Sequence, residues 1–166
     1  MKRVMMMCVL AGLAIAPAVA QTPKYGVTVK ADEKTDFSKF KTYAWEHGWQ
    51  AYDKTVNANI LAAVDRELAG VGLTKKASGP SDLIVTYASL RRIDVDTNAK
   101  QETDGMRRQY DVGSLVVLLL EPGTRKELFR GRVDQPIELD APDKVKSVID
   151  TAVAEMFAKY PTKKKK

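Results

Sequence analysis

Residues 112–133 read VGSLVVLLLEPGTRKELFRGRV and contain two strands joined by a turn. Val112 to Leu120 is apolar or β-branched at most positions, which is typical of a central strand of a sheet. Glu121-Pro122-Gly123-Thr124 supplies the proline and glycine that favour a turn. In Lys126 to Val133 apolar residues alternate with arginines, the pattern of a strand with one face in water. These residues therefore predict a β-hairpin.

Other segments extend this hairpin into a sheet. Asp82 to Leu90 is apolar, β-branched or aromatic at most positions and is predicted to be a second central strand. Tyr25 to Lys30 and Phe40 to Trp45 are shorter candidates. Asp94 to Arg108 is polar and charged, so we expect a long exposed loop or the tip of an extended hairpin. The sheet is expected to have about five strands, mostly antiparallel.

A first helix is predicted between Asp53 and Gly72. Asp53 or Thr55 is available as its N-cap, and Gly70 or Gly72 would end it. The residues at the spacing of one helix face are Val56, Ile60, Val64, Leu68 and Val71. Such an apolar face must be buried against another element.

A second helix is predicted before Pro161. Asp140 can cap it, and Pro142 suits its first turn. Its apolar stripe consists of Val145, Val148, Ile149, Ala152, Val153, Met156, Phe157 and Tyr160. Burying each large side chain of the stripe contributes about 1.5 to 3 kcal/mol, so this helix needs a broad docking surface. The expected fold class is α+β: a mostly antiparallel sheet with two amphipathic helices packed on one face.

The N-terminus has the three parts of a secretory signal peptide. A basic start, Met-Lys-Arg, precedes an uncharged apolar run from Val4 to Ala16. The run ends in Ala18-Val19-Ala20 before polar Gln21, which predicts cleavage after Ala20. The apolar run is shorter than the ~20 residues of a spanning helix, so no membrane span is expected. The protein is therefore expected to be periplasmic or secreted.

The single cysteine, Cys8, bears on anchoring and redox chemistry. A bacterial lipid anchor would require cysteine directly after the triplet Leu10-Ala11-Gly12, where this chain has Leu13. We therefore expect a protein that is not a lipoprotein. Because Cys8 would leave with the signal, the mature chain would have no thiol for a disulfide, a nucleophile or a metal.

The net positive charge lies at the two ends of the chain. Apart from Lys2 and Arg3 and the run Lys163 to Lys166, lysines and arginines equal the 21 acidic residues in number. A neutral body without a recognised motif is not expected to bind nucleic acid. The lysine tail could contact an anionic membrane weakly. The expected organisation is a signal peptide at 1–20, a single domain at 21–162 and a basic disordered tail at 163–166.

Several short motifs occur in an order that is characteristic of one family. They are Phe37 to Trp45, Ile60 to Leu68, Ser81 to Tyr87, Gly113 to Val117, Phe129-Arg130-Gly131 and Met156 to Pro161. Together they resemble the bacterial envelope family catalogued as domain of unknown function 4136. The resemblance implies a periplasmic or outer-envelope α+β domain, often lipid-anchored, with no established activity. Glu121 and Phe129 depart from the aspartate and tryptophan that we expect in the family.

The segment Trp45-Glu46-His47-Gly48-Trp49-Gln50-Ala51-Tyr52-Asp53 holds the chain's one histidine. Trp45, His47, Trp49 and Tyr52 could form an aromatic platform for a ligand or partner. In the alternative, Trp45 packs under the first helix while His47 and Trp49 lie in a surface loop. No Gly-x-Ser-x-Gly or His-Glu-x-x-His pattern accompanies the histidine, so no catalytic residue is assigned.

A metal site is the second hypothesis, because Asp94, Asp96 and Asn98 place oxygen ligands at alternate positions, as in calcium loops. The segment does not fit the EF-hand template, which needs glycine where Ala99 stands and glutamate where Gly105 stands. A strand running out into a polar loop explains the same residues.

Arginines bracket this acidic loop. Arg91 and Arg92 precede it, and Arg107 and Arg108 follow it. If the flanks paired across a hairpin, the four guanidinium groups could bind phosphate, carboxylate or an acidic polysaccharide. In the alternative, the arginines are solvated and balanced by neighbouring carboxylates. Arg91, Arg107 and Arg108 are thus candidate partner-binding residues.

The sequence favours a non-catalytic, exported envelope protein that binds a partner protein or an envelope component and needs no cofactor. A metal-assisted hydrolase using loop carboxylates is one alternative. A small-ligand carrier is another, and it would require a cavity between the helices and the sheet.

Overall fold

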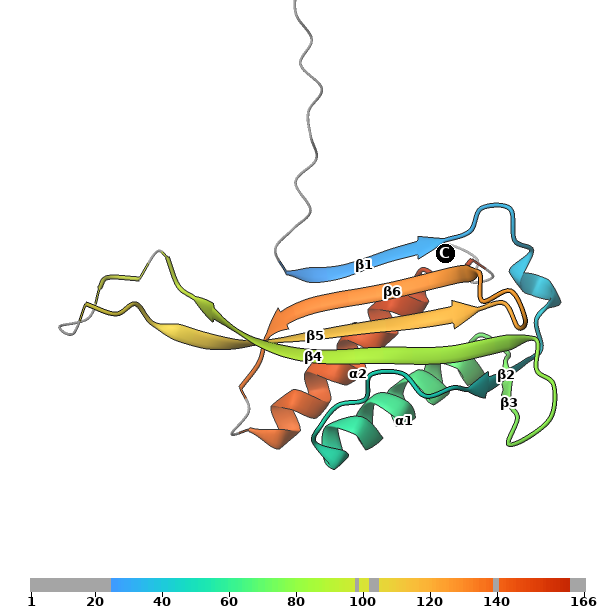
Figure 1. Cartoon of the computed structure of the whole chain (residues 1–166), viewed down its shortest axis with the longest axis horizontal. Coiled ribbons are helices and arrows are strands. Elements are labelled where there is room, and N and C mark those ends of the chain that lie inside the picture. Colours follow the sequence, from blue (N-terminus) through green and yellow to red (C-terminus); the bar gives the residue numbers. More distant parts are fainter. Residues whose placement is uncertain (1–24, 98, 102–104, 139–140, 162–166) are drawn as a thin grey trace, which may run out of the picture.

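The computed structural model describes residues 25–97, 99–101, 105–138 and 141–161 (Figure 1). The predicted signal peptide at 1–20 and the lysine tail at 163–166 lie outside these residues. The described chain forms a sheet and two long helices that pack on the same face of it, which confirms the α+β class.

The sheet has six strands in the described residues, in the order β1-β6-β5-β4-β2-β3. The strands are β1 (Gly26–Ala31), β2 (Thr42–Trp45), β3 (Thr74–Lys75), β4 (Leu83–Val95), β5 (Gln109–Leu120) and β6 (Glu127–Pro136). The sheet is mixed, because β2 runs parallel to both β3 and β4. A helix lies between β2 and these strands in the chain, and such a helical crossover allows the next strand to run parallel to β2. The expectation of about five strands missed β3, which is too short to show a strand pattern.

The predicted hairpin at 112–133 is confirmed as β5 and β6. The two strands pair antiparallel, with Leu115 opposite Val133 and Val117 opposite Gly131. Gly123 turns the chain with φ of 84°, in the left-handed region that glycine adopts without strain.

The strands β4 and β5 form a second, longer hairpin. Their pairing runs from Ile84 opposite Leu120 to Val95 opposite Gln109. Both strands therefore continue past the end of β6 and project from the body as a two-stranded ribbon (Figure 1). Of the two expectations for Asp94 to Arg108, the tip of an extended hairpin is the one that the structure has, because the paired strands reach Val95 and Gln109.

The two helices differ at their N-termini. Asp53 caps α1 (Lys54–Gly70), accepting hydrogen bonds from the backbone N–H of Thr55 at 2.7 Å and of Val56 at 2.9 Å. In α2 (Pro142–Ala158) the N-cap position is Ala141 and has no side-chain cap hydrogen bond. This corrects the expected cap at Asp140, which lies outside the described residues.

The core lies between the helices and the sheet and is aromatic at one end. The rings of Phe129 and Phe157 stack with centroids 5.5 Å apart, and Tyr160 lies 5.7 Å from Phe129. Phe129, one of the two departures from the family pattern, is fully buried. A phenylalanine thus satisfies this position of the core.

Candidate functional site

Trp45 anchors the connection from β2 to α1. Its Nε1 donates to Asp65 of α1 at 2.7 Å, and its ring meets Tyr87 edge-on with centroids 6.1 Å apart. Asp65 also accepts hydrogen bonds from Tyr43 and Lys75. Burial raises the pKa of Asp65, but these hydrogen bonds outweigh it and hold the pKa below its ordinary value. Trp45 therefore packs under the helix, as the alternative interpretation of this segment expects.

The next residues run along the edge of β4. The backbone N–H of Glu46 donates to the carbonyl of Val85 at 2.9 Å, and that of Ser89 donates to the carbonyl of Trp49 at 2.8 Å. Between these bonds, a Cβ at Gly48 would lie closer than 3.0 Å to the carbonyl oxygen of Tyr87. Only a residue without a side chain lets the loop approach β4 this closely.

This approach places Trp49 on the face of the sheet that the helices leave uncovered, here called the open face. Trp49 pairs in parallel with Ala88, and paired residues present their side chains on one face. The indole is 72% exposed. Ala88 pairs in turn with Val116 of β5.

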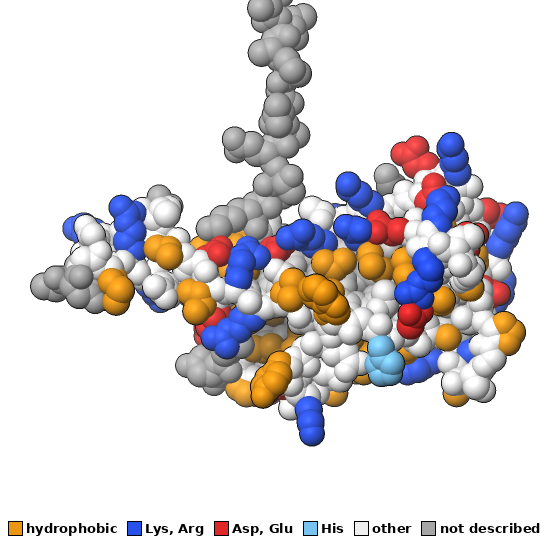
Figure 2. All heavy atoms as spheres, viewed as in Figure 1, with side chains coloured by type: hydrophobic (Ala, Val, Ile, Leu, Met, Phe, Trp, Pro, Cys, Tyr) orange, Lys and Arg blue, Asp and Glu red, His pale blue; other side chains and the backbone are white. Residues whose placement is uncertain are grey.

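Apolar side chains of β4 and β5 lie beside Trp49 on the open face. The open-face patch consists of Trp49, Ala88, Leu90, Val116 and Leu118. Leu90 is 54% exposed, whereas Ala88, Val116 and Leu118 are half-buried. Arg132 and Arg130 of β6 lie opposite Val116 and Leu118. Figure 2 shows hydrophobic side chains gathered over the sheet, with lysine and arginine side chains around them.

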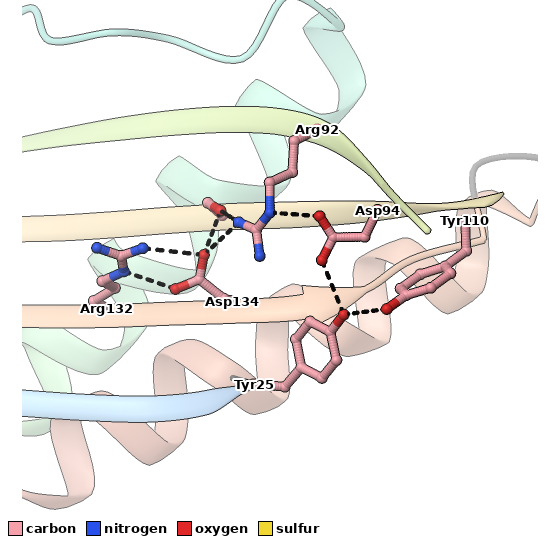
Figure 3. Close-up of polar contacts among 7 residues, drawn as sticks. Tyr25, Arg92, Asp94, Tyr110, Arg132 and Asp134 are labelled. Atoms are coloured by element: carbon pink, nitrogen blue, oxygen red, sulfur yellow. Dashed lines mark hydrogen bonds and ion pairs between the residues drawn. The ribbon is translucent and has the colours of Figure 1, made fainter. Parts of the chain in front are cut away.

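A polar network borders the patch toward the projecting ribbon (Figure 3). Asp134, only 9% exposed, accepts hydrogen bonds from Arg132 Nε at 2.7 Å, Arg92 Nη1 at 2.8 Å and Ser114 Oγ at 2.6 Å. Arg92 Nε also donates to Asp94 at 3.1 Å. The hydrogen bond from Arg132 is the main reason that the pKa of Asp134 lies far below its ordinary value despite burial.

Comparison with known proteins identifies the family. The family model described as Domain of unknown function (DUF4136) matches residues 27–162. The chain belongs to this family. The resemblance noted in the short motifs is therefore confirmed. No curated protein matches this DUF4136 chain by sequence.

Solved structures share the fold of the DUF4136 domain. A PDZ domain protein from Parabacteroides distasonis is 14% identical with a TM-score of 0.59, over 85% of this chain and 36% of that protein. The DUF4136 chain thus corresponds to about a third of that protein's length. The PelC dodecamer from Paraburkholderia phytofirmans is 10% identical with a TM-score of 0.53, over 80% of this chain and 94% of PelC. At these identities the likeness is one of fold.

The aromatic candidates of the DUF4136 chain do not form one platform. His47 is exposed, with its Nδ1 3.2 Å from Gln50 Nε2. Tyr52 is fully exposed in the connection just before α1. Trp49 alone of the four combines exposure with a place in the open-face patch.

The arginine candidates do not converge either. Arg91 lies on the helix-facing side of β4, where its Nε donates to Asp111 at 2.7 Å. Arg107 donates to the carbonyl of Thr97, and the backbone of Arg108 pairs with Asp96. Asp96 is five positions after Arg91, which is roughly 16 Å along the ribbon. The four guanidinium groups therefore do not gather at one site. Arg91 and Arg92 pair instead with Asp111 and Asp94, as the alternative interpretation describes.

The proposed metal ligands have other partners. Asp94 accepts hydrogen bonds from Arg92 and from Tyr25, and Asp96 accepts one from the backbone of Ala99. Asn98 lies outside the described residues. Among the residues that are described, no group of three or more His, Cys, Asp or Glu side chains is placed to hold a metal ion.

No helix within the described ranges is both long and apolar enough to cross a membrane.

Proposed function

We propose that this DUF4136 protein is an exported, non-catalytic envelope protein that binds a partner protein through the open-face patch. The observation that carries the proposal is the exposed indole of Trp49 beside the apolar side chains of β4 and β5. Export is supported by the signal-peptide pattern of residues 1–20.

The composition of the patch suits a protein interface. The solvated face of an antiparallel sheet is ordinarily polar, and a contiguous apolar strip on it marks a contact surface. Interface energy concentrates in tryptophan, tyrosine and arginine, within an apolar centre and a polar rim. Here Trp49 adjoins the apolar centre, and Arg130 and Arg132 form a rim on β6. Burying the exposed part of one indole contributes roughly 3 kcal/mol before the costs of association.

A second copy of the chain is one candidate partner, and another envelope protein is the other. PelC, which shares the fold, is a dodecamer. The mass of a cross-linked product separates the two cases, because a second copy doubles the mass of the chain.

Site-specific photo-cross-linking in the bacterium that carries the protein tests the proposal. With the photoreactive residue at position 90, inside the patch, we expect a discrete cross-linked product. Trp49→Ala should reduce its yield at least about fivefold, because an interface tryptophan contributes 2 kcal/mol or more. Tyr52→Ala, which removes a fully exposed ring outside the patch, should leave the yield unchanged.

Two results would overturn the proposal: no product from position 90, or a product that Trp49→Ala leaves intact. Both alanine variants remove exposed rings, so their melting temperatures should match the wild type. This control separates lost binding from lost folding.

A further inference from the structure

A cavity of about 370 Å³ lies between the N-terminal halves of the two helices and the sheet. Val56 and Ile60 of α1, Val145 and Ile149 of α2, and Leu115 of β5 are among its apolar lining residues. The volume falls in the range of small-molecule sites, which are concave, mostly apolar and carry few polar groups. This is the cavity that the carrier hypothesis requires.

The register of the sheet determines which of its side chains line this cavity. Under the aromatic end of the core, the strands present large side chains such as Phe129 to the helices. Toward the ribbon, one cross-strand row presents Arg91, Gly113 and Gln135. The central position of that row has no side chain of its own, and the side chain of Ile137 packs over it, 3.3 Å from where a Cβ of Gly113 would lie. Ile137 is thus part of the apolar lining, and the exposed side chains of Arg91 and Gln135 lie at the rim of the cavity. The result is an apolar chamber with a polar mouth.

The charge at the mouth points to the end group of a ligand. Arg91 lines the cavity and is exposed, and its Nε binds Asp111. A guanidinium carries five donors, so Arg91 can donate hydrogen bonds from its terminal nitrogens to a second carboxylate. Asp53 also lies at the mouth, but its carboxylate already accepts hydrogen bonds from the backbone N–H groups of Thr55 and Val56. Arg91 is therefore the charged group that can receive an anionic ligand.

We infer that the cavity binds a medium-length fatty acid, with its acyl chain between the helices and the sheet and its carboxylate on Arg91. A carbon group of an acyl chain is counted at roughly 30 Å³, the volume of a water molecule in the liquid, so the cavity volume corresponds to about twelve such groups. An apolar chamber of this size suits a saturated chain rather than a polar metabolite. This site faces the helices, whereas the partner surface lies on the open face; Leu90 is the one residue of the open-face patch that also lines the cavity.

Calorimetric titration of the purified, exported protein with dodecanoate, below its micelle concentration, tests the inference. We expect one bound molecule. Ser89→Phe and Val148→Phe each place a ring in the cavity from a different element and should weaken binding at least about tenfold. Arg91→Gln should weaken dodecanoate binding roughly tenfold and leave the binding of dodecanol nearly unchanged. Arg66→Gln is the matched charge control, because Arg66 is a similarly exposed arginine that pairs with Asp150 and does not line the cavity.

Binding of dodecanoate that neither phenylalanine variant weakens would overturn the cavity assignment, as would the absence of binding. Equal losses for dodecanoate and dodecanol in Arg91→Gln would overturn the role of Arg91. The melting temperature of each variant without ligand identifies any that fails to fold, and the two phenylalanine substitutions act from different elements, so one can replace the other.

Discussion

Gly48→Ala is expected to lower the free energy of unfolding by about 3 kcal/mol and to detach residues 46–50 from β4. An added Cβ would lie closer than 3.0 Å to the carbonyl oxygen of Tyr87 and to Thr86 Oγ1. The carbonyl belongs to the middle of β4 and cannot move without breaking the sheet. The loop must therefore move instead, and Trp49 leaves its position beside Ala88.

Chemical denaturation and amide hydrogen exchange measure the two parts of this prediction. The N–H of Ser89 donates to the carbonyl of Trp49, so its exchange should accelerate when the loop detaches. Gly70→Ala is the matched control, because a Cβ there has no neighbour within 4 Å and alanine favours the helix by about 0.5 to 1 kcal/mol. A Gly48→Ala protein of wild-type stability, with Ser89 still protected, would contradict the account.

Asp134→Asn is expected to destabilise the fold by about 2 to 3 kcal/mol. The carboxylate lies between two arginines, and an amide cannot accept from both without presenting its own N–H groups to one of them. The loss is below that for a fully buried pair, since both guanidinium groups reach solvent. Denaturant unfolding at neutral pH measures the change in the free energy of unfolding.

The difference in the free energy of unfolding between wild type and Asp134→Asn should become smaller as the pH falls. The pKa of Asp134 is lowered in the folded protein, so its stabilising effect is fully present above the unfolded pKa of about 3.9 and is lost as pH falls below it. The gap between wild type and Asp134→Asn should therefore shrink below about pH 4. Asp150→Asn removes a carboxylate that also meets two cations, Arg66 and Lys146, but on the helix surface. It should cost under about 1 kcal/mol. Equal losses in the two variants would show that Asp134 has no special role.

Local patterns predicted most of the fold. The alternation and the proline-glycine turn located β5 and β6, and helical spacing with Asp53 located α1. The parallel pairing of β2 with β4 depends on where α1 returns the chain, which is a tertiary property. The predicted N-cap of α2, Asp140, was wrong by one residue, because several polar and small residues can occupy that position.

The candidate site was predictable in part. Trp49 was identified as exposed in a surface loop, but its place beside Ala88 follows from the close approach at Gly48. The apolar run Val112 to Leu120 predicted a central strand, but it did not show that Val116 and Leu118 lie half-buried on the open face. The pairing of Arg92 and Arg132 through Asp134 depends on three-strand register, which single-strand periodicity does not contain.

Native mass spectrometry of the protein, exported with its own signal and purified gently from the envelope, tests the central claim most directly. The account predicts a chain that begins at Gln21 in a complex with a partner protein, and a complex that is absent for Trp49→Ala but present for Tyr52→Ala. An uncleaved chain, or the same monomer for wild type and Trp49→Ala, would contradict it.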